Sequence, residues 1–181
     1  MPKRLDVYLS DNNIVKSRSL AATLIKQGSV EVNGRICTKP SFTVGDGDNV
    51  KIIGELPKYV GRGGLKLEKA LAHYRLHLDG TVCIDIGAST GGFTDCMLQN
   101  GAAKVYSVDV GTDQLDEKLR NDSRVISMEK TDIRNCVGTL PQVDFISIDV
   151  SFISLKLVLP SAFALLKDGG ECVALIKPQF E

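Results

Sequence analysis

The sequence lacks a long hydrophobic run and a secretion signal. Its most apolar stretch, residues 155–166, contains Lys156 and Pro160 and is shorter than the roughly 20 apolar residues that span a bilayer. The N-terminus places basic residues first but continues with Asp6 and Ser10 in place of an apolar segment. These absences exclude a membrane-spanning or secreted class, and we expect a soluble, cytoplasmic protein.

Paired-cysteine motifs are also missing. The five cysteines are an odd number at wide spacings, which indicates scattered thiols in a reducing compartment and excludes a disulfide framework. His73 and His77 lie four residues apart, but no Glu or Cys motif accompanies them, so we predict no metal site. Tryptophan is absent, which excludes nothing by itself, whereas the 17 glycines are clustered and mark tight turns.

The length and charge pattern suggest two unequal parts. With 181 residues and 43% hydrophobic composition, the chain can form one domain of about 120 residues and a small companion. Residues 1–60 hold nine Lys and Arg against six Asp and Glu, a net charge of +3, and residues 61–181 hold 13 against 16, a net charge of −3. The basic N-terminal part is therefore a candidate for binding a polyanion.

Residues 1–54 predict a small domain of two helices followed by a hairpin. Residues 4–10 have helical periodicity, Ser17 is a plausible N-cap of a second helix that stops at Gly28, and Asn33-Gly34 predicts a tight turn between two short strands. A further strand is expected at residues 50–53. Basic residues concentrate on the second helix and the following turn, which favours RNA binding over a structural domain with solvated charges.

The run RLDVYLSDNNIVKSRSLAATLIKQGSVEVNGRICTKPSFTVGDGDNVKI resembles the small RNA-binding domain shared by a bacterial small-subunit ribosomal protein, tyrosyl-tRNA synthetase and several RNA-modifying enzymes. In that family the second helix and the adjacent loop face RNA and recognise its shape and backbone more than its base sequence. By position, the resemblance implies RNA-binding residues Lys16, Ser17, Arg18, Lys26 and Arg35.

Residues 55–63 are rich in glycine and predict a linker to a larger domain at 64–181. There, a helix from Gly64 towards Leu78 precedes apolar strands that alternate with helices. Strands are expected at 82–86, 104–108, 125–127, 143–148 and 170–176, and helices at 93–100, 114–120 and 153–167. This alternation predicts an α/β fold with a mostly parallel, Rossmann-like sheet.

A glycine-rich turn after the first of these strands predicts a nucleotide site. Its G-x-x-x-G-G spacing, with Ser89 where a dinucleotide fingerprint has glycine, favours S-adenosylmethionine (SAM) over NAD. Asp109 is placed to accept hydrogen bonds from the ribose hydroxyls, the alternative being a helix N-cap or turn residue. Asp132 is placed to hold the adenine amino group, although it could equally be a turn residue. The predicted cofactor-binding residues are Asp85, Gly87, Ala88, Ser89, Gly91, Gly92, Phe93, Asp109 and Asp132.

The methyl acceptor is indicated by Asp149, Lys177 and Lys66. The Asn/Asp-Pro-Pro-aromatic run of amino-methylating enzymes is absent, and no cysteine is placed as the nucleophile of cytosine-C5 enzymes. Strand ends at one edge of a parallel sheet converge, so Asp149 and Lys177 should meet there. An ammonium favours the alkoxide of a ribose 2′-hydroxyl. Lys66 alone would be an ordinary solvated lysine, but the three together predict a 2′-O-methyltransferase.

Four segments carry a closer resemblance: GRGGLKLEKAL, CIDIGASTGGFTDCMLQNGA, SIDVSFISL and LIKPQFE. In this order they resemble the TlyA family of bacterial rRNA methyltransferases, often labelled hemolysins, whose catalytic domain is FtsJ-like. The family implies SAM-dependent methylation of cytidine 2′-hydroxyls in 16S and/or 23S rRNA, with rRNA and ribosomal subunits as partners. Its Lys-Asp-Lys-Glu tetrad maps onto Lys66, Asp149 and Lys177, and the fourth member has no counterpart here.

The family continues beyond LIKPQFE, so we expect this chain to be truncated, to lack C-terminal strands and to bind SAM weakly or methylate poorly. Two other functions stay open. One is a non-catalytic RNA-binding protein with a degenerate methyltransferase fold. The other is a membrane-active hemolysin, which is disfavoured because no amphipathic membrane segment is visible. The sequence does not define an oligomeric state.

Overall fold

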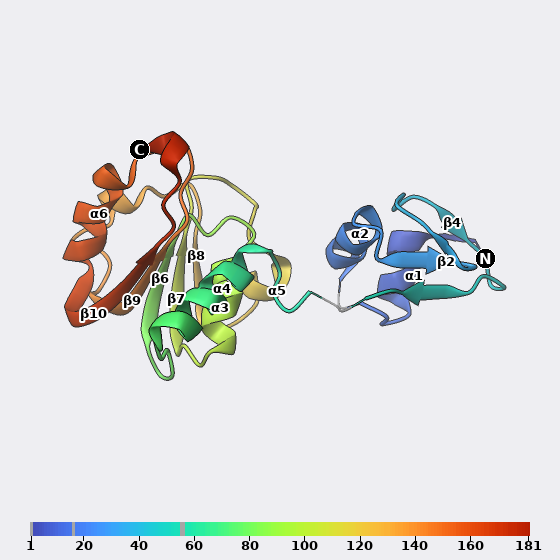
Figure 1. The fold of residues 1–181 in the computed structure, drawn as a ribbon, viewed down its shortest axis with the longest axis horizontal. Helices are drawn as coiled ribbons and strands as arrows, with labels where there is room; N and C mark the ends of the chain where they lie inside the picture. Colours follow the sequence, from blue (N-terminus) through green and yellow to red (C-terminus); the bar gives the residue numbers. More distant parts are fainter. Residues whose placement is uncertain (1, 16, 55–56) are drawn as a thin grey trace. The chain divides into compact units, whose positions relative to one another are not determined.

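The computed structural model describes residues 2–15, 17–54 and 57–181, and the chain divides into two compact units, Met1–Leu56 and Pro57–Glu181 (Figure 1). Residues 55–56 of the predicted linker lie outside the described residues. Residues 57–63 of that linker belong to the larger unit.

The smaller unit packs two helices against short strands. Its elements are β1 (Lys3–Arg4), α1 (Leu5–Asp11), α2 (Arg18–Lys26), β2 (Val30–Val32), β3 (Arg35–Ile36), β4 (Thr43–Val44) and β5 (Val50–Ile52). Strands β3, β2 and β5 form an antiparallel sheet, and β1 pairs with β4. Leu5 and Leu9 of α1 and Leu24 and Ile25 of α2 are almost completely buried, because helical spacing places these apolar residues on one face.

Two local predictions for this unit are confirmed. The Ser17 hydroxyl accepts a hydrogen bond from the Leu20 N–H and so caps α2. Asn33 and Gly34 have φ values of 53° and 76°, as a type I′ hairpin turn requires. The pair β1 and β4 was missed, because strands of two residues are too short to show an alternating pattern.

The larger unit contains a five-stranded parallel sheet in the order β10-β9-β6-β7-β8, which confirms the predicted α/β class. The strands are β6 (Val82–Ile86), β7 (Lys104–Val108), β8 (Val125–Met128), β9 (Val143–Ile148) and β10 (Leu166–Ala174). The helices are α3 (Gly63–Tyr74), α4 (Gly92–Gln99), α5 (Glu117–Arg120) and α6 (Leu155–Ala164), with short 3-10 turns η1 (Ile133–Asn135) and η2 (Pro178–Phe180).

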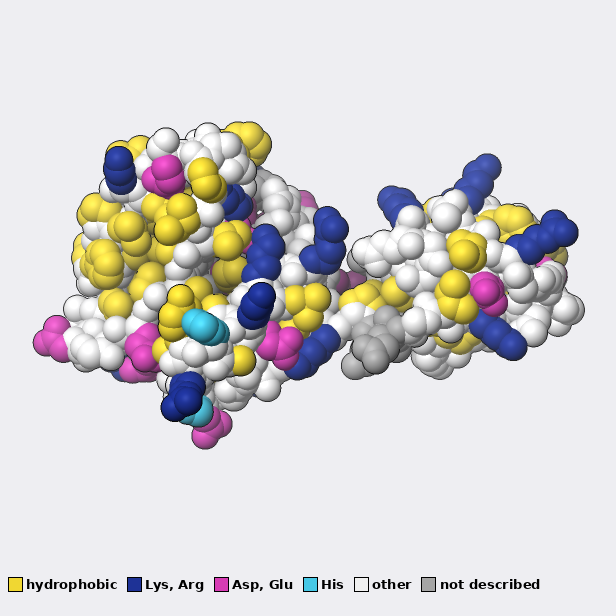
Figure 2. Space-filling model, viewed as in Figure 1, with side chains coloured by type: hydrophobic (Ala, Val, Ile, Leu, Met, Phe, Trp, Pro, Cys, Tyr) yellow, Lys and Arg dark blue, Asp and Glu magenta, His cyan; other side chains and the backbone are white. Residues whose placement is uncertain are grey.

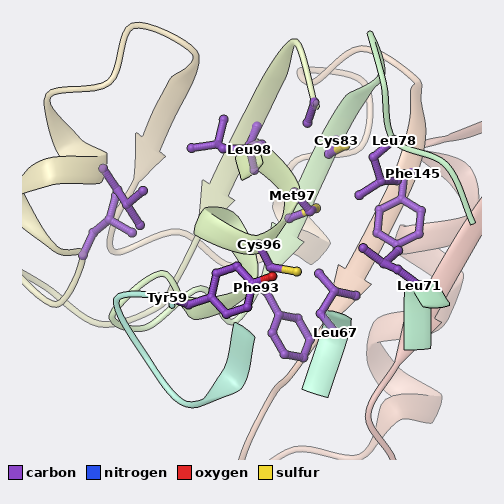
Figure 3. Close-up of a cluster of buried hydrophobic side chains, with 14 residues drawn as sticks. Tyr59, Leu67, Leu71, Leu78, Cys83, Phe93, Cys96, Met97, Leu98 and Phe145 are labelled. Carbon is purple, nitrogen blue, oxygen red and sulfur yellow. The ribbon is translucent and has the colours of Figure 1, made fainter. Parts of the chain in front are cut away.

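Apolar residues cover both faces of this sheet. Alternate residues of a strand point to opposite faces, so Cys83 of β6 packs with α3 and α4, whereas its neighbour Ile84 packs with α6. Figure 3 shows the first of these cores, in which Tyr59 lies beside Phe93 and Cys96. Hydrophobic side chains that remain exposed gather over α6 in Figure 2, among them Leu157 and Phe163.

Part of the predicted linker is packed into the larger unit instead of bridging freely. Tyr59 is only 4% exposed, and the Val60 N–H donates to the buried Asp95 carboxylate at 2.9 Å. Asp95 also pairs with Lys118 at 3.1 Å. The glycines of this segment predicted a linker, whereas in the structure they allow it to lie closely against α4.

Helix α3 was predicted to run towards Leu78 but ends at Tyr74, because Arg75 adopts the left-handed conformation with φ of 55°. The Leu76 N–H then bonds back to the Leu71 carbonyl and closes the helix end. Strand β10 begins four residues before the predicted Gly170, with a register irregularity between Leu166 and Glu171.

Among residues 2–15, 17–54 and 57–181, no helix is long and apolar enough to cross a membrane. Within the same described ranges, no group of three His, Cys, Asp or Glu side chains could hold a metal ion.

Candidate functional site

A cavity of about 550 Å³ lies where the chain leaves β6 and β9 at the carboxyl end of the sheet. In the sheet, β6 lies between β7 and β9. The chain after β6 crosses over to β7 on one side, whereas β9 pairs with β6 on the other side, so the loops after β6 and β9 diverge and leave a crevice. The lining residues are Gly61, Arg62, Gly63, Lys66, Gly87, Ala88, Ser89, Thr90, Gly92, Phe93, Asp149, Ser151 and Lys177.

Two glycines of the turn after β6 are required by close backbone contacts. Gly87 has φ of +82°, and a Cβ atom there would lie 2.6 Å from the Asp149 carbonyl oxygen. A Cβ atom on Gly92 would lie 2.9 Å from the backbone nitrogen of Gly64 and 3.1 Å from the carbonyl oxygen of Gly61. The turn is therefore held against both the β9 loop and the start of α3, and its backbone can approach a bound ligand.

Asp109, at the end of β7, holds the glycine-rich turn in place. One carboxylate oxygen accepts from the Ser89 N–H at 2.7 Å, and the other accepts from the Gly111 N–H at 2.7 Å. Each carboxylate oxygen has a second lone pair, so the same side chain can still accept hydrogen bonds from a ligand. Asp109 does not line the cavity itself.

Three other predicted cofactor residues also lie outside the cavity lining. Asp85 is completely buried, and its carboxylate accepts from Thr94 at 2.7 Å and Ser147 at 3.0 Å. Gly91 faces the side chains of α5 and the preceding loop. Asp132 caps η1 and pairs with Arg134 at 2.6 Å, which is the arrangement of the turn alternative.

Asp85 belongs to a buried polar network beneath the turn. Burial raises its pKa to about 6, against an ordinary value of 3.8, because the charged carboxylate is removed from water, and hydrogen bonds from Thr94 and Ser147 only partly offset this. The sequence suggested a ligand contact, but the structure shows a side chain that supports the turn from below.

The Asp85→Asn variant should lose part of the pH dependence of unfolding. A folded-state pKa above the unfolded value means that stability falls as the pH rises from about 4 to about 6, by about 3 kcal/mol at most. Urea unfolding at pH 4.5 and pH 7 would measure this difference. It should shrink in Asp85→Asn by the part that Asp85 contributes and persist unchanged in Asp168→Asn, which changes an exposed carboxylate. An unchanged difference in Asp85→Asn would contradict the assignment.

Beside the glycine-rich turn in the cavity lining, Asp149 lies between two lysines. Lys177 Nζ is 2.6 Å from Asp149 Oδ1 and donates to the Ser151 hydroxyl at 2.8 Å, while Lys66 Nζ is 3.9 Å from Asp149 Oδ2. Asp149 and Lys177 are about one fifth exposed, and Lys66 is 54% exposed. The structure thus brings together the three residues that the sequence proposed as catalytic.

Sequence reasoning missed several residues of the cavity. Thr90 and Ser151 lie inside the motifs that were recognised but were not singled out, and Ser151 accepts a hydrogen bond from Lys177. Arg62 also lines the cavity, four residues before Lys66. This helical spacing was the available signal, because residues four apart lie on the same side of a helix.

The predicted RNA-binding residues lie on separate segments of the smaller unit. Arg18 and Lys26 are at the two ends of α2, and Arg35 is exposed on β3. The Ser17 hydroxyl is engaged as the helix cap. Lys16 lies outside the described residues.

Arg18 also belongs to an ion cluster around Asp6. The Asp6 carboxylate, 3% exposed, accepts two hydrogen bonds from Arg4 and one from Arg18, at 2.9 to 3.0 Å. The bonds from Arg4 and then from Arg18 lower the pKa of Asp6 to about 2. The arginine side chains stay half exposed, at 50% and 58%.

Asp6→Asn should destabilise the smaller unit by about 1–3 kcal/mol at pH 7, because a neutral amide cannot pair with two guanidinium groups. A lowered folded-state pKa stabilises above about pH 4, and this contribution is lost as the pH falls towards 2. Denaturant unfolding monitored by hydrogen exchange would measure it. Asp11→Asn, which removes an exposed pair with Lys3, should cost far less. Equal losses in the two variants would rule out a special role for Asp6.

Comparison with known proteins places these features in context. Residues 59–181 match the family described as FtsJ-like methyltransferase, and residues 3–50 match the S4 domain. YqxC of Bacillus subtilis, provisionally named an rRNA methyltransferase, is 46% identical over 182 residues, covering 99% of this chain and 65% of YqxC. The 16S/23S rRNA (cytidine-2′-O)-methyltransferase TlyA of Mycobacterium tuberculosis is 40% identical over 184 residues, covering 98% of this chain and 68% of TlyA.

A solved structure from Streptococcus thermophilus, provisionally assigned as a hemolysin, is 50% identical with a TM-score of 0.70. The match covers 99% of this chain and 67% of that chain. The chain therefore spans about two thirds of the length of these three relatives.

Proposed function

This chain belongs to the FtsJ-like methyltransferase family and carries an S4 domain, and on that premise we propose that it serves SAM-dependent 2′-O-methylation of cytidine in rRNA. The observation that carries the proposal is Asp149 held between Lys66 and Lys177 beside the glycine-rich turn. The TlyA relative, whose name gives this reaction, supports the choice of acceptor.

The residues after β6 fit SAM. Gly87 lets the turn pack against the Asp149 backbone only because it has no side chain, and Asp109 would accept the ribose hydroxyls with its remaining lone pairs. Gly87, Ala88, Ser89, Gly92 and Phe93 would line the bound cofactor. Asp85 and Gly91 would act indirectly, by supporting the turn, and a contact from Asp132 to adenine would require a change of its pairing with Arg134. When bound, SAM supplies a methyl group on a sulfonium.

The two lysines and Asp149 would prepare the acceptor oxygen. A ribose 2′-hydroxyl is a weak acid, and the Lys177 ammonium would stabilise the negative charge that develops on its oxygen. Asp149 fixes the Lys177 ammonium at 2.6 Å, and Lys66 adds a second positive charge from α3. The partial burial of Asp149 and Lys177 limits screening by water, which strengthens these interactions.

The smaller unit would deliver the RNA. Residues 1–56 hold eight Lys and Arg against six Asp and Glu, a net charge of +2, and Arg18, Lys26 and Arg35 are exposed for phosphate contacts. Lys16 and Ser17 complete the proposed set. The partner would be rRNA or a ribosomal subunit, and the protein would act in the cytoplasm.

Calorimetry and a methyl-transfer assay together test the proposal. The protein should bind SAM and transfer its methyl group to rRNA, and Lys66→Ala should keep SAM affinity within about threefold while slowing transfer by about tenfold or more. Lys69→Ala, on the exposed side of the same helix, should change neither. RNA and SAM binding without any methyl transfer would favour a non-catalytic RNA-binding protein, and absence of SAM binding would refute the cofactor assignment.

A further inference from the structure

Arg62 is a cation in the lining of the proposed active site. Of the three Lys and Arg residues that line the cavity, Lys66 and Lys177 both lie near Asp149. Arg62 is exposed and has no hydrogen-bond or ion-pair partner among the residues that the structure describes. Its five N–H donors are therefore available to a ligand.

The backbone around Arg62 packs closely against the glycine-rich turn after β6 and against Tyr59. A Cβ atom on Gly61 would lie 2.8 Å from the Thr90 hydroxyl oxygen, and one on Gly64 would lie within 2.4 Å of the Tyr59 ring. These contacts leave little freedom for the segment, so the Arg62 side chain starts from a defined position. Arg62 has helical φ and ψ values at the start of α3, four residues before Lys66. Side chains at this spacing are neighbours, about 5–6 Å apart at Cβ.

The net positive charge of the cavity lining favours the binding of an anion. Its lining contains three cationic side chains and one carboxylate, Asp149. SAM carries a sulfonium, an ammonium and a carboxylate, so it would add further positive charge. The acceptor must bring the compensating negative charge, and in RNA that charge is on the phosphates.

We propose that Arg62 binds a phosphate of the RNA backbone beside the acceptor ribose and so sets the position of the 2′-hydroxyl. The inference rests on the proposed function. In RNA the 2′-hydroxyl and the 3′-phosphate are on adjacent ribose carbons. When the acceptor oxygen lies at the cluster of Lys66, Asp149 and Lys177, the 3′-phosphate must lie close to that cluster. Arg62 lines the same cavity four residues before Lys66, so it is close enough to bind this phosphate. A guanidinium binds phosphate with two parallel hydrogen bonds, which fixes orientation as well as distance.

Binding measurements on the full chain test this role. Arg62→Ala should weaken binding of an rRNA fragment by about tenfold and reduce the dependence of log Kd on log salt concentration by about one. SAM affinity, measured by calorimetry, should stay the same. Arg62→Lys should recover the salt dependence but only part of the affinity, because lysine cannot form the paired hydrogen bonds. Lys69→Ala, which removes a charge from α3 outside the cavity, should have a much smaller effect.

Three results would overturn the inference. Loss of SAM affinity in Arg62→Ala with unchanged RNA binding would assign Arg62 to the cofactor carboxylate. Equal effects of Arg62→Ala and Lys69→Ala would indicate general electrostatic attraction without a specific contact. If the wild type binds RNA and Arg62→Ala binds it equally well, the phosphate site alone is refuted. If the wild type binds no RNA, the proposed function is refuted as well.

Discussion

Asp149→Asn should slow methyl transfer to rRNA by at least about 100-fold while leaving SAM affinity within about threefold. The carboxylate holds Lys177 Nζ at 2.6 Å and lies 3.9 Å from Lys66 Nζ. An amide keeps the shape of the side chain but has no negative charge to balance the positive charges of the two ammonium groups. Lys177 would therefore be free to move away from the acceptor oxygen. The contact between Gly87 and the Asp149 backbone is unaffected, which is why cofactor binding should persist.

Asp144→Asn is a matched control for this prediction. Asp144 lies on β9, the strand that ends just before Asp149, and pairs with Lys167 at 2.7 Å, but it is outside the lining of the proposed active site. Its loss should leave the transfer rate within about threefold once stability is taken into account. If Asp149→Asn slowed transfer no more than Asp144→Asn, the proposed catalytic cluster would be wrong.

Gly87→Ala should abolish measurable SAM binding and destabilise the larger unit by more than about 2 kcal/mol. The new Cβ atom would lie 2.6 Å from the Asp149 carbonyl oxygen and 3.0 Å from its carbonyl carbon, so the β9 loop would have to move. The left-handed φ of +82° adds a cost of about 1 kcal/mol or more for a residue with a side chain. Calorimetry with SAM and urea unfolding would measure the two effects.

Gly138→Ala separates backbone strain from the clash. Gly138 has nearly the same φ, +85°, but a Cβ atom there would meet nothing within 4 Å. This variant should show only the strain, with SAM affinity unchanged. If Gly87→Ala bound SAM as tightly as Gly138→Ala, the turn after β6 would not be the cofactor site.

The features that the sequence predicted well depend on strong local patterns. Buried parallel strands are apolar on both faces, so β6, β7 and β9 were recognisable as continuous runs. Turns that require glycine were recognisable from the glycines in the sequence, as at Gly87. Convergence of Asp149 and Lys177 followed from topology alone, because parallel strands end at one edge.

The features that were missed depend on tertiary contacts. Nothing local shows that Arg75 turns left-handed and ends α3, or that β1 pairs with a strand some forty residues away. The position of Asp85 before the turn suggested that it contacts the ligand. In the structure its buried carboxylate accepts hydrogen bonds from Thr94 and Ser147 instead. Gly61 was assigned to the linker, and only its close approach to Thr90 shows that it is a contact position.

The most direct test is to identify the methylated atom. Ribosomal RNA incubated with the protein and isotopically labelled SAM should yield labelled 2′-O-methylcytidine after digestion to nucleosides, and the adjacent phosphodiester should resist alkaline hydrolysis. With Asp149→Asn the label incorporated in the same time should fall by at least about 100-fold. Label on a cytosine or adenine base, or label incorporated equally by the wild type and Asp149→Asn, would contradict a cluster of two lysines and an aspartate that prepares a ribose oxygen.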